Sequence, residues 1–154
     1  MKTFLEINVG DEFKSECKIS ADDLEKYLSF SGIKNVIYEN GNFSNQQGKM
    51  VSGRAILSKM EGEFTRLNEM YGNLLIFYGI DGDPNWNNRQ TRFLKPLFTD
   101  EKLNIKFKIS DKRDQNNEFG LLVVDFEGSK ENGDLVLVSN RNLYQMKKDP
   151  PIKK

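Results

Sequence analysis

The chain has 154 residues, 37% of them hydrophobic and 30% charged, and its 23 basic and 23 acidic side chains give a formal net charge of zero. This length predicts one domain, and the balanced charge argues against a dedicated nucleic-acid-binding protein, which would normally carry a basic excess. The sequence contains no histidine, which excludes the Ser-His-Asp and Cys-His catalytic systems and every metal site that needs imidazole.

The cysteine content and the apolar runs indicate where the protein works. A single cysteine, Cys17, forms no internal disulfide, which favours a reducing, cytoplasmic setting. Because Cys17 lies in a strand-like run, we expect a buried structural thiol, with a nucleophile as the alternative. The N-terminus lacks the apolar segment of a signal peptide, and the longest apolar run, 74–80, is far shorter than the ~20 residues that span a bilayer. We therefore expect a soluble protein without a membrane partner.

The first third of the chain predicts short strands followed by an amphipathic helix. Apolar, β-prone residues favour strands at 3–8 and 12–19. Ser20 followed by Asp23 has the pattern of a shortened capping box. The apolar residues after it recur at helical spacing, which predicts a helix over 22–30.

The middle of the chain predicts a long loop and then the principal helix. Residues 32–50 are rich in Gly, Asn, Gln and Ser and show no period, so we expect a surface loop of the kind that often carries function. The residues after it have the strongest helical pattern of the sequence, with apolar side chains three and four apart. They predict a helix of about 18 residues from near Ser52 to Tyr71, closed by Gly72 and Asn73.

The rest of the chain predicts strands. Residues 103–110 alternate strictly between apolar and polar side chains, the pattern of a strand with one buried face. Asn132 followed by Gly133 predicts a hairpin turn. The other expected strands are 74–80, 90–94, 119–126 and 135–143. The sequence therefore predicts one α+β domain over residues 1–147, with an antiparallel curved sheet wrapped around a long central helix, and a frayed basic tail at 148–154.

Several motifs occur in an order that is familiar from one family. The most specific is the run Arg-Phe-Leu-Lys-Pro-Leu-Phe-Thr-Asp-Glu-Lys-Leu at 92–103. The others are Gly-Asp-Glu-Phe at 10–13, Ile-Ser-Ala-Asp-Asp-Leu at 19–24, Tyr-Leu-Ser-Phe-Ser-Gly at 27–32, Met-Val-Ser-Gly-Arg-Ala at 50–55 and Asn-Gly-Asp-Leu-Val at 132–136. Together they resemble the MaoC-like branch of the hot-dog fold, the family of (R)-specific enoyl-thioester hydratases and dehydratases. The resemblance implies a hot-dog fold over nearly the whole chain, paired as a homodimer or with another hot-dog subunit.

The chain departs from this family where the catalytic pair of the hydratases should lie. Those enzymes carry Ser-Gly-Asp-x-Asn-Pro-x-His after the first helix, whereas this chain has Ile33 in the place of the aspartate and Tyr38 in the place of the histidine. Hydration needs a base for the attacking water and an acid for the α-carbon. Isoleucine supplies neither, and a phenol is a poor base near neutral pH. The resemblance therefore implies an acyl-thioester-binding protein without hydratase activity, or the non-catalytic subunit of a hydratase.

The start of the central helix is the expected binding site. In the family, a backbone N–H at this point holds the thioester carbonyl, and Gly53 is the matching residue, flanked by Ser52 and Arg54. The resemblance implies that these residues and Asn35 bind an acyl-CoA or another acyl thioester, with no cofactor and no metal. The alternative is that Gly53 only allows close packing.

Residual catalysis and a purely structural role remain as alternatives. Tyr38 or Glu39 would replace the missing pair in a hydratase. Glu63 borders the apolar stripe of the central helix and is the best candidate for a thioesterase carboxylate, since Glu61 and Glu69 fall on the polar side. A structural interaction module is the third possibility if the acyl tunnel is filled. Three aromatic residues are candidates to line or to fill that tunnel: Phe30, Tyr38 and Phe43.

Overall fold

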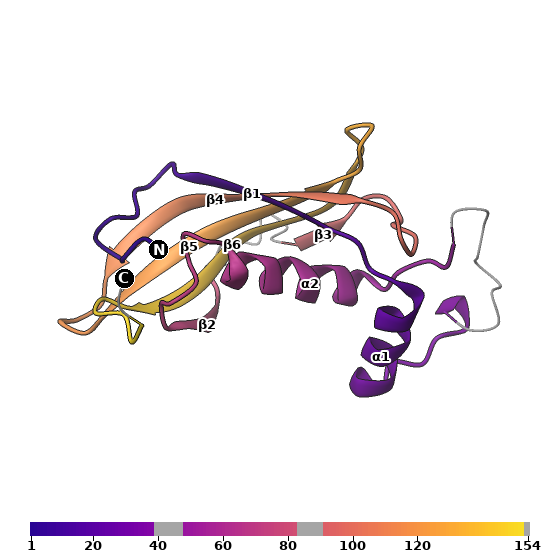
Figure 1. The fold of residues 1–154 in the computed structure, drawn as a ribbon, viewed down its shortest axis with the longest axis horizontal. Coiled ribbons are helices and arrows are strands. Elements are labelled where there is room, and N and C mark those ends of the chain that lie inside the picture. The colour runs from indigo at the N-terminus through magenta and orange to yellow at the C-terminus, as the bar shows by residue number, and fades with distance from the viewer. Residues whose placement is uncertain (39–47, 83–90, 153–154) are drawn as a thin grey trace.

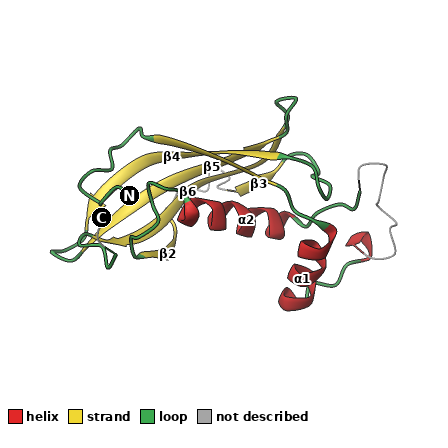
Figure 2. Cartoon of the chain, viewed as in Figure 1, coloured by secondary structure: helices red, strands yellow, loops and turns green. Residues whose placement is uncertain are grey.

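One antiparallel six-stranded sheet curves along a single long helix in the computed structural model, which describes residues 1–38, 48–82 and 91–152 (Figures 1 and 2). The strand order is β1 (Glu12–Cys17), β4 (Leu103–Asp114), β5 (Phe119–Ser129), β6 (Leu135–Lys147) and β2 (Leu75–Ile80), and β3 (Thr91–Phe93) also pairs with β6. The helices are α1 (Ala21–Ser31), the 3-10 helix η1 (Val36–Tyr38) and α2 (Gly53–Arg66). The expected α+β fold, with a curved antiparallel sheet around a central helix, is confirmed.

The buried face of α2 forms the core against the concave side of the sheet. Its buried residues are Ala55, Ile56, Met60 and Phe64. The ring of Phe64 lies 5.3 Å from that of Phe107 and 5.3 Å from that of Tyr144, which ties the helix to β4 and β6. These contacts fix the position of the whole helix, so its N-terminal end comes to lie beside α1 at one end of the sheet (Figure 1).

The first helix forms as its sequence predicts. Ser20 Oγ accepts a hydrogen bond from the backbone N–H of Asp23, and the Asp23 carboxylate accepts one from the backbone N–H of Ser20, which is the expected capping box. Gly32, with φ of 73°, ends α1 in the left-handed conformation that glycine adopts without strain. The loop that follows is confirmed for its described parts. Glu39 and Phe43 lie outside the described residues.

The N-terminal strand predicted at 3–8 is wrong. The chain makes a turn there, in which the backbone N–H groups of Glu6 and Ile7 both donate to the carbonyl oxygen of Thr3. Phe4 and Ile7 are buried, so the apolar spacing of this segment reflects a turn with two inward side chains.

The central helix is shorter than expected, because it ends at Arg66 instead of Tyr71. Leu67 leaves the helical conformation with ψ of 144°, and the backbone N–H groups of Met70 and Tyr71 then bond to the Leu67 carbonyl in a separate turn. Both Leu67 and Met70 are buried, so the apolar spacing continues through that turn. Among the described residues, no helix is long and apolar enough to cross a membrane.

The strands β4, β5 and β6 extend beyond their predicted ends. Pairing continues through polar residues because each strand has a neighbour that supplies hydrogen bonds, as between Asp114 and Gly120. Irregular register at 109–111 and at 124–126 shifts the inward-facing positions, which hides the alternation on which the prediction depended.

Residues 148–152 are bound to the body of the protein, where a frayed tail was expected. The backbone N–H of Lys148 donates to the Glu118 carbonyl, and that of Ile152 donates to the Gly72 carbonyl. Pro150 is buried.

Candidate functional site

A cavity of about 500 Å³ opens at the N-terminal end of α2. Its walls come from the segment around η1, from the start of α2 and from the chain after β3. Six residues singled out in the sequence line it together: Ile33, Asn35, Tyr38, Ser52, Gly53 and Arg54. The fold thus gathers into one cavity residues that are about 20 positions apart in sequence. Their part in binding stays a prediction.

The start of α2 is held in place by the segment that follows β3. The backbone N–H of Val51 donates to the Leu97 carbonyl at 2.8 Å. Lys49 and Thr99 exchange two bonds, since Lys49 N–H donates to Thr99 Oγ1 and Thr99 N–H donates to the Lys49 carbonyl. The run at 92–103 therefore positions the helix terminus and one wall of the cavity.

The first turn of α2 has no side-chain cap. Ser52 is the N-cap residue and is only 3% exposed, but its hydroxyl makes no capping hydrogen bond. The first turn contains no acidic residue. The first backbone N–H groups of a helix have no partner within it, and the helix dipole favours a carbonyl oxygen or an anion beside them. The backbone N–H groups at this end of α2 can therefore donate hydrogen bonds to a carbonyl oxygen or an anion of a ligand.

Arg54 adds a positive charge at the same place. Its side chain is exposed and makes no ion pair with any other described residue. A cation in the first turn of a helix opposes the helix dipole. Arg54 therefore has no evident stabilising role and is available to an anionic or carbonyl group of a ligand.

A second cavity, of about 570 Å³, lies on the other side of Phe93. Its apolar lining comes from Leu57 on α2 and from Phe77 and Ile80 on β2. Glu61 also faces it, and Glu61 Oε2 accepts a hydrogen bond of 2.9 Å from the Tyr144 hydroxyl. Burial raises the pKa of Tyr144, and the nearby Glu61 carboxylate raises it further, so the hydroxyl stays protonated and remains the donor.

Comparison with solved structures places this arrangement among known folds. An Archaeoglobus structure described as monoamine oxidase regulatory protein has a TM-score of 0.73 at 20% identity and covers 96% of this chain and 95% of its own. The (R)-hydratase PhaJ1 from Pseudomonas aeruginosa has a TM-score of 0.68 at 14% identity, and the match covers 96% of this chain and 85% of the hydratase. The HadBC (3R)-hydroxyacyl-ACP dehydratase complex from Mycobacterium tuberculosis has a TM-score of 0.57 at 13% identity, and the match covers 90% of this chain and 95% of the dehydratase chain. No protein-family model matches the sequence, and no curated protein sequence does.

The protein has a hot-dog fold. Its structural neighbours are MaoC-like dehydratases and (R)-hydratases, as the motifs of the sequence led us to expect. At these identities the likeness establishes the fold alone. The chemistry of this hot-dog protein therefore has to be argued from its own side chains.

The carboxylates of α2 are arranged differently from the sequence-based expectation. Glu63 does not line either of the two cavities beside Phe93; its Oε2 accepts a hydrogen bond from Ser15 Oγ at 3.0 Å, and Lys59 Nζ lies 3.9 Å from its Oε1. Glu61, expected on the solvent side, faces the second cavity.

The thiol of Cys17 is a poor nucleophile. Burial, followed by the Glu63 charge, raises the pKa of Cys17 to about 11, so this half-buried thiol is protonated at neutral pH.

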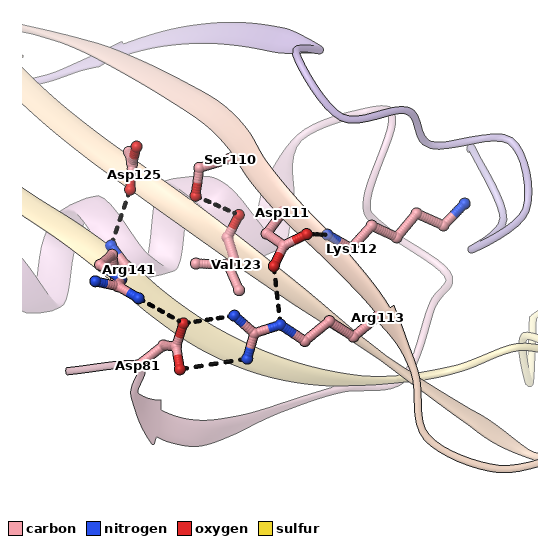
Figure 3. Close-up of polar contacts among 8 residues, drawn as sticks. All are labelled: Asp81, Ser110, Asp111, Lys112, Arg113, Val123, Asp125 and Arg141. Carbon is pink, nitrogen blue, oxygen red and sulfur yellow. Dashed lines mark hydrogen bonds and ion pairs between the residues drawn. The ribbon is translucent and has the colours of Figure 1, made fainter. Parts of the chain in front are cut away.

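A cluster of charges at the end of β2 is fully paired (Figure 3). The guanidinium of Arg113 donates to both carboxylate oxygens of Asp81, at 2.7 and 3.3 Å, and Arg141 donates to Asp81 at 3.2 Å. Asp111 accepts from Arg113 as well. The hydrogen bond from Arg113, aided by that from Arg141, holds the pKa of Asp81 below its usual value. The cluster fastens the end of β2, and with it one wall of the second cavity, to β4 and β6.

One expectation about aromatic side chains needs revision, and one aromatic residue was missed. Phe30 is 90% exposed on α1 and lines neither of these cavities, so it is no tunnel residue. Phe93 lines both of them, although nothing in the sequence had marked it beyond its place in the run at 92–103. Its position depends on a contact with Gly53, about 40 residues earlier, which no local pattern records.

Proposed function

We propose that this protein binds acyl thioesters at the N-terminal end of α2 and does not hydrate them. The observation that carries the proposal is the cavity of about 500 Å³ at an uncapped helix terminus, lined by Ser52, Gly53 and Arg54. A volume of this size is within the usual range for small-molecule sites. The thioester carbonyl would accept hydrogen bonds from the N–H groups of the first turn. The acyl chain would lie against apolar side chains of the same cavity, such as Ile33, Ile56 and Leu97.

The loss of hydratase chemistry follows from the side chains beside that carbonyl. Ile33 and Tyr38 face the cavity from the segment where the related hydratases carry their aspartate and histidine. Isoleucine has no proton to give or accept, so the water needed for hydration has no base at that position. The residues that would hold the substrate are retained, and those that would activate water are not.

The proposal is tested with crotonyl-CoA and butyryl-CoA. Isothermal titration of both ligands measures binding, and the loss of the enoyl absorbance of crotonyl-CoA measures hydration. We expect saturable binding of both thioesters and no hydration above the rate without protein. A matched control is Ser15→Ala, which lies away from the cavity and should bind as the wild type does. Failure of both thioesters to bind would overturn the proposal.

A hydratase that uses Tyr38 or Glu39 is the second candidate, because Tyr38 does line the cavity. In that case crotonyl-CoA would be hydrated, and Tyr38→Phe or Glu39→Gln would abolish the activity. A thioesterase that uses Glu63 has less support, since Ser15 and Lys59 engage that carboxylate. Release of free thiol that is lost in Glu63→Gln would establish it.

We also propose that the sheet edge at β2 pairs with a second hot-dog subunit, either another copy or a catalytic partner. Ile76, Phe77, Tyr78 and Ile80 are between 45% and 56% exposed on this strand. An exposed apolar edge strand tends to pair with another chain. The related HadBC structure is a complex. Sedimentation of the purified protein tests the first possibility: a mass of one chain would exclude pairing with another copy and leave only a catalytic partner.

For the location, we propose a cytoplasmic, reducing compartment. The single, half-buried thiol of Cys17 supports this, because a free cysteine persists most readily where disulfides are kept reduced.

A further inference from the structure

Phe93 is the shared wall of the two cavities at α2. The first cavity, of about 500 Å³, and the second, of about 570 Å³, are both lined by Phe93 and Arg54. The first one contains the uncapped helix terminus, and the second one extends along α2 towards β2. A ligand that enters the first cavity therefore meets the second across one aromatic side chain.

The ring of Phe93 lies directly on Gly53. A Cβ placed on Gly53 would come 2.5 Å from Cε1 of this ring, so the ring occupies space that only glycine leaves open. The backbone of Phe93 is fixed, because β3 pairs with β6 and the Leu94 N–H donates to the Val136 carbonyl at 2.8 Å. The side chain, by contrast, is about half exposed, at 49%. The ring can therefore turn about its side-chain bonds while the strand keeps its place.

The second cavity offers apolar surface, and two of its polar side chains, Glu61 and Asn142, are already engaged. Leu57, Phe77 and Ile80 supply the apolar part. The Glu61 carboxylate accepts the Tyr144 hydroxyl, and the Asn142 amide donates to backbone and side-chain oxygens of its own sheet. A methylene chain gains from the apolar walls without leaving these groups unsatisfied. The apolar walls formed by Leu57, Phe77 and Ile80 therefore suit the distal part of an aliphatic chain, whereas Arg54 lines the part shared with the first cavity.

We infer that Phe93 is a chain-length gate for the acyl group. With the ring on Gly53, an acyl chain whose carbonyl lies at the α2 terminus is confined to the first cavity, which selects short chains. With the ring turned aside, the two cavities join and longer chains pass into the second. This inference rests on the proposed function, because it assigns the substrate class of the same site.

The gate is tested by comparing butyryl-CoA with dodecanoyl-CoA in wild type and in Phe93→Ala. We expect the wild type to prefer the short chain, and the variant to shift the ratio of the two dissociation constants towards the long chain at least tenfold. Phe30→Ala is the matched control, since that phenylalanine is exposed on α1 and should leave the ratio unchanged. An unchanged ratio in Phe93→Ala, with short-chain binding intact, would overturn the gate and leave the proposed function standing.

A double variant shows where the longer chain goes. Ile80→Trp fills part of the second cavity, so combined with Phe93→Ala it should remove the gain for dodecanoyl-CoA. The readout is the ratio of the two dissociation constants, which should return to the wild-type value; if the gain persists, the chain does not enter the second cavity and the inference is wrong. Absence of binding by any thioester in every variant would overturn the proposed function itself, and the gate with it. Phe93→Leu replaces Phe93→Ala if thermal melting shows that the alanine variant does not fold.

Discussion

The N-terminal end of α2 and the end of β2 differ in how their charged and polar groups are satisfied. At the end of β2, the Asp81 carboxylate accepts three hydrogen bonds from Arg113 and Arg141. At the start of α2, Arg54 has no ionic partner among the described residues and the Ser52 hydroxyl caps nothing. Paired groups hold the fold together, whereas groups beside a cavity that have no partner among the described residues are available to a ligand. Substitutions in the two regions should therefore separate stability from binding.

The largest effect is expected for Gly53→Leu. The new side chain would collide with the Phe93 ring and project into the space between the two cavities. Binding of butyryl-CoA should fall at least tenfold, which corresponds to about 1.4 kcal/mol, and overpacking should lower the free energy of unfolding by about 1–3 kcal/mol. Titration calorimetry and urea unfolding measure the two quantities. Gly62→Leu, on the same helix with open space at its Cβ, is the control and should bind normally.

A loss of about 1.5 kcal/mol in the free energy of unfolding is expected for Tyr144→Phe. The change leaves Glu61 without the donor that now lies 2.9 Å away. Urea unfolding measures the loss. Glu61→Gln keeps an acceptor for Tyr144 and should cost less. Equal stability of wild type and Tyr144→Phe would show that this hydrogen bond does not fasten α2 to β6.

Arg54→Gln should affect binding and spare stability. Removing a cation from the first turn of α2 should change the free energy of unfolding by less than about 0.5 kcal/mol, in the stabilising direction. Affinity for butyryl-CoA should fall about fivefold, or about 1 kcal/mol, if the guanidinium contacts the ligand. A marked loss of stability in this variant would show that Arg54 makes a stabilising contact in the folded protein.

The smallest effect, about 0.5 kcal/mol of unfolding free energy, is expected for Asp81→Asn, since its ion pairs are partly exposed. The folded-state pKa of Asp81 is lowered, so the pairing stabilises the protein above the unfolded pKa of about 3.9 and is lost as the pH falls through the lower folded value. The difference between wild type and variant should be full at pH 7 and should shrink below about pH 4. Thermal melting across this range measures it. Thioester binding at pH 7 should not change.

The residues of the candidate site illustrate how far the sequence reaches. Ser52 and Gly53 were singled out because the family resemblance puts the carbonyl-binding N–H at the start of the central helix, and Ile33 and Tyr38 because the hydratase motif has fixed spacing. Their assembly into one cavity was implied only by the resemblance and by no local pattern, because it depends on hydrogen bonds such as that from Val51 to Leu97, between segments about 45 residues apart.

The sequence by itself determined the α+β fold class and the capping box at Ser20, because capping and periodicity depend on residues that are neighbours in the chain. The absence of histidine is a property of the composition alone. Only the tertiary structure decided that Glu61 faces a cavity while Glu63 accepts a hydrogen bond from Ser15. Both carboxylates lie within one helical turn, so their surroundings depend on which strand packs beside each of them. It also decided that Phe93 lies on Gly53. The missing histidine excluded whole classes of chemistry, and the packing around α2 forms the cavity in which we propose that a ligand binds.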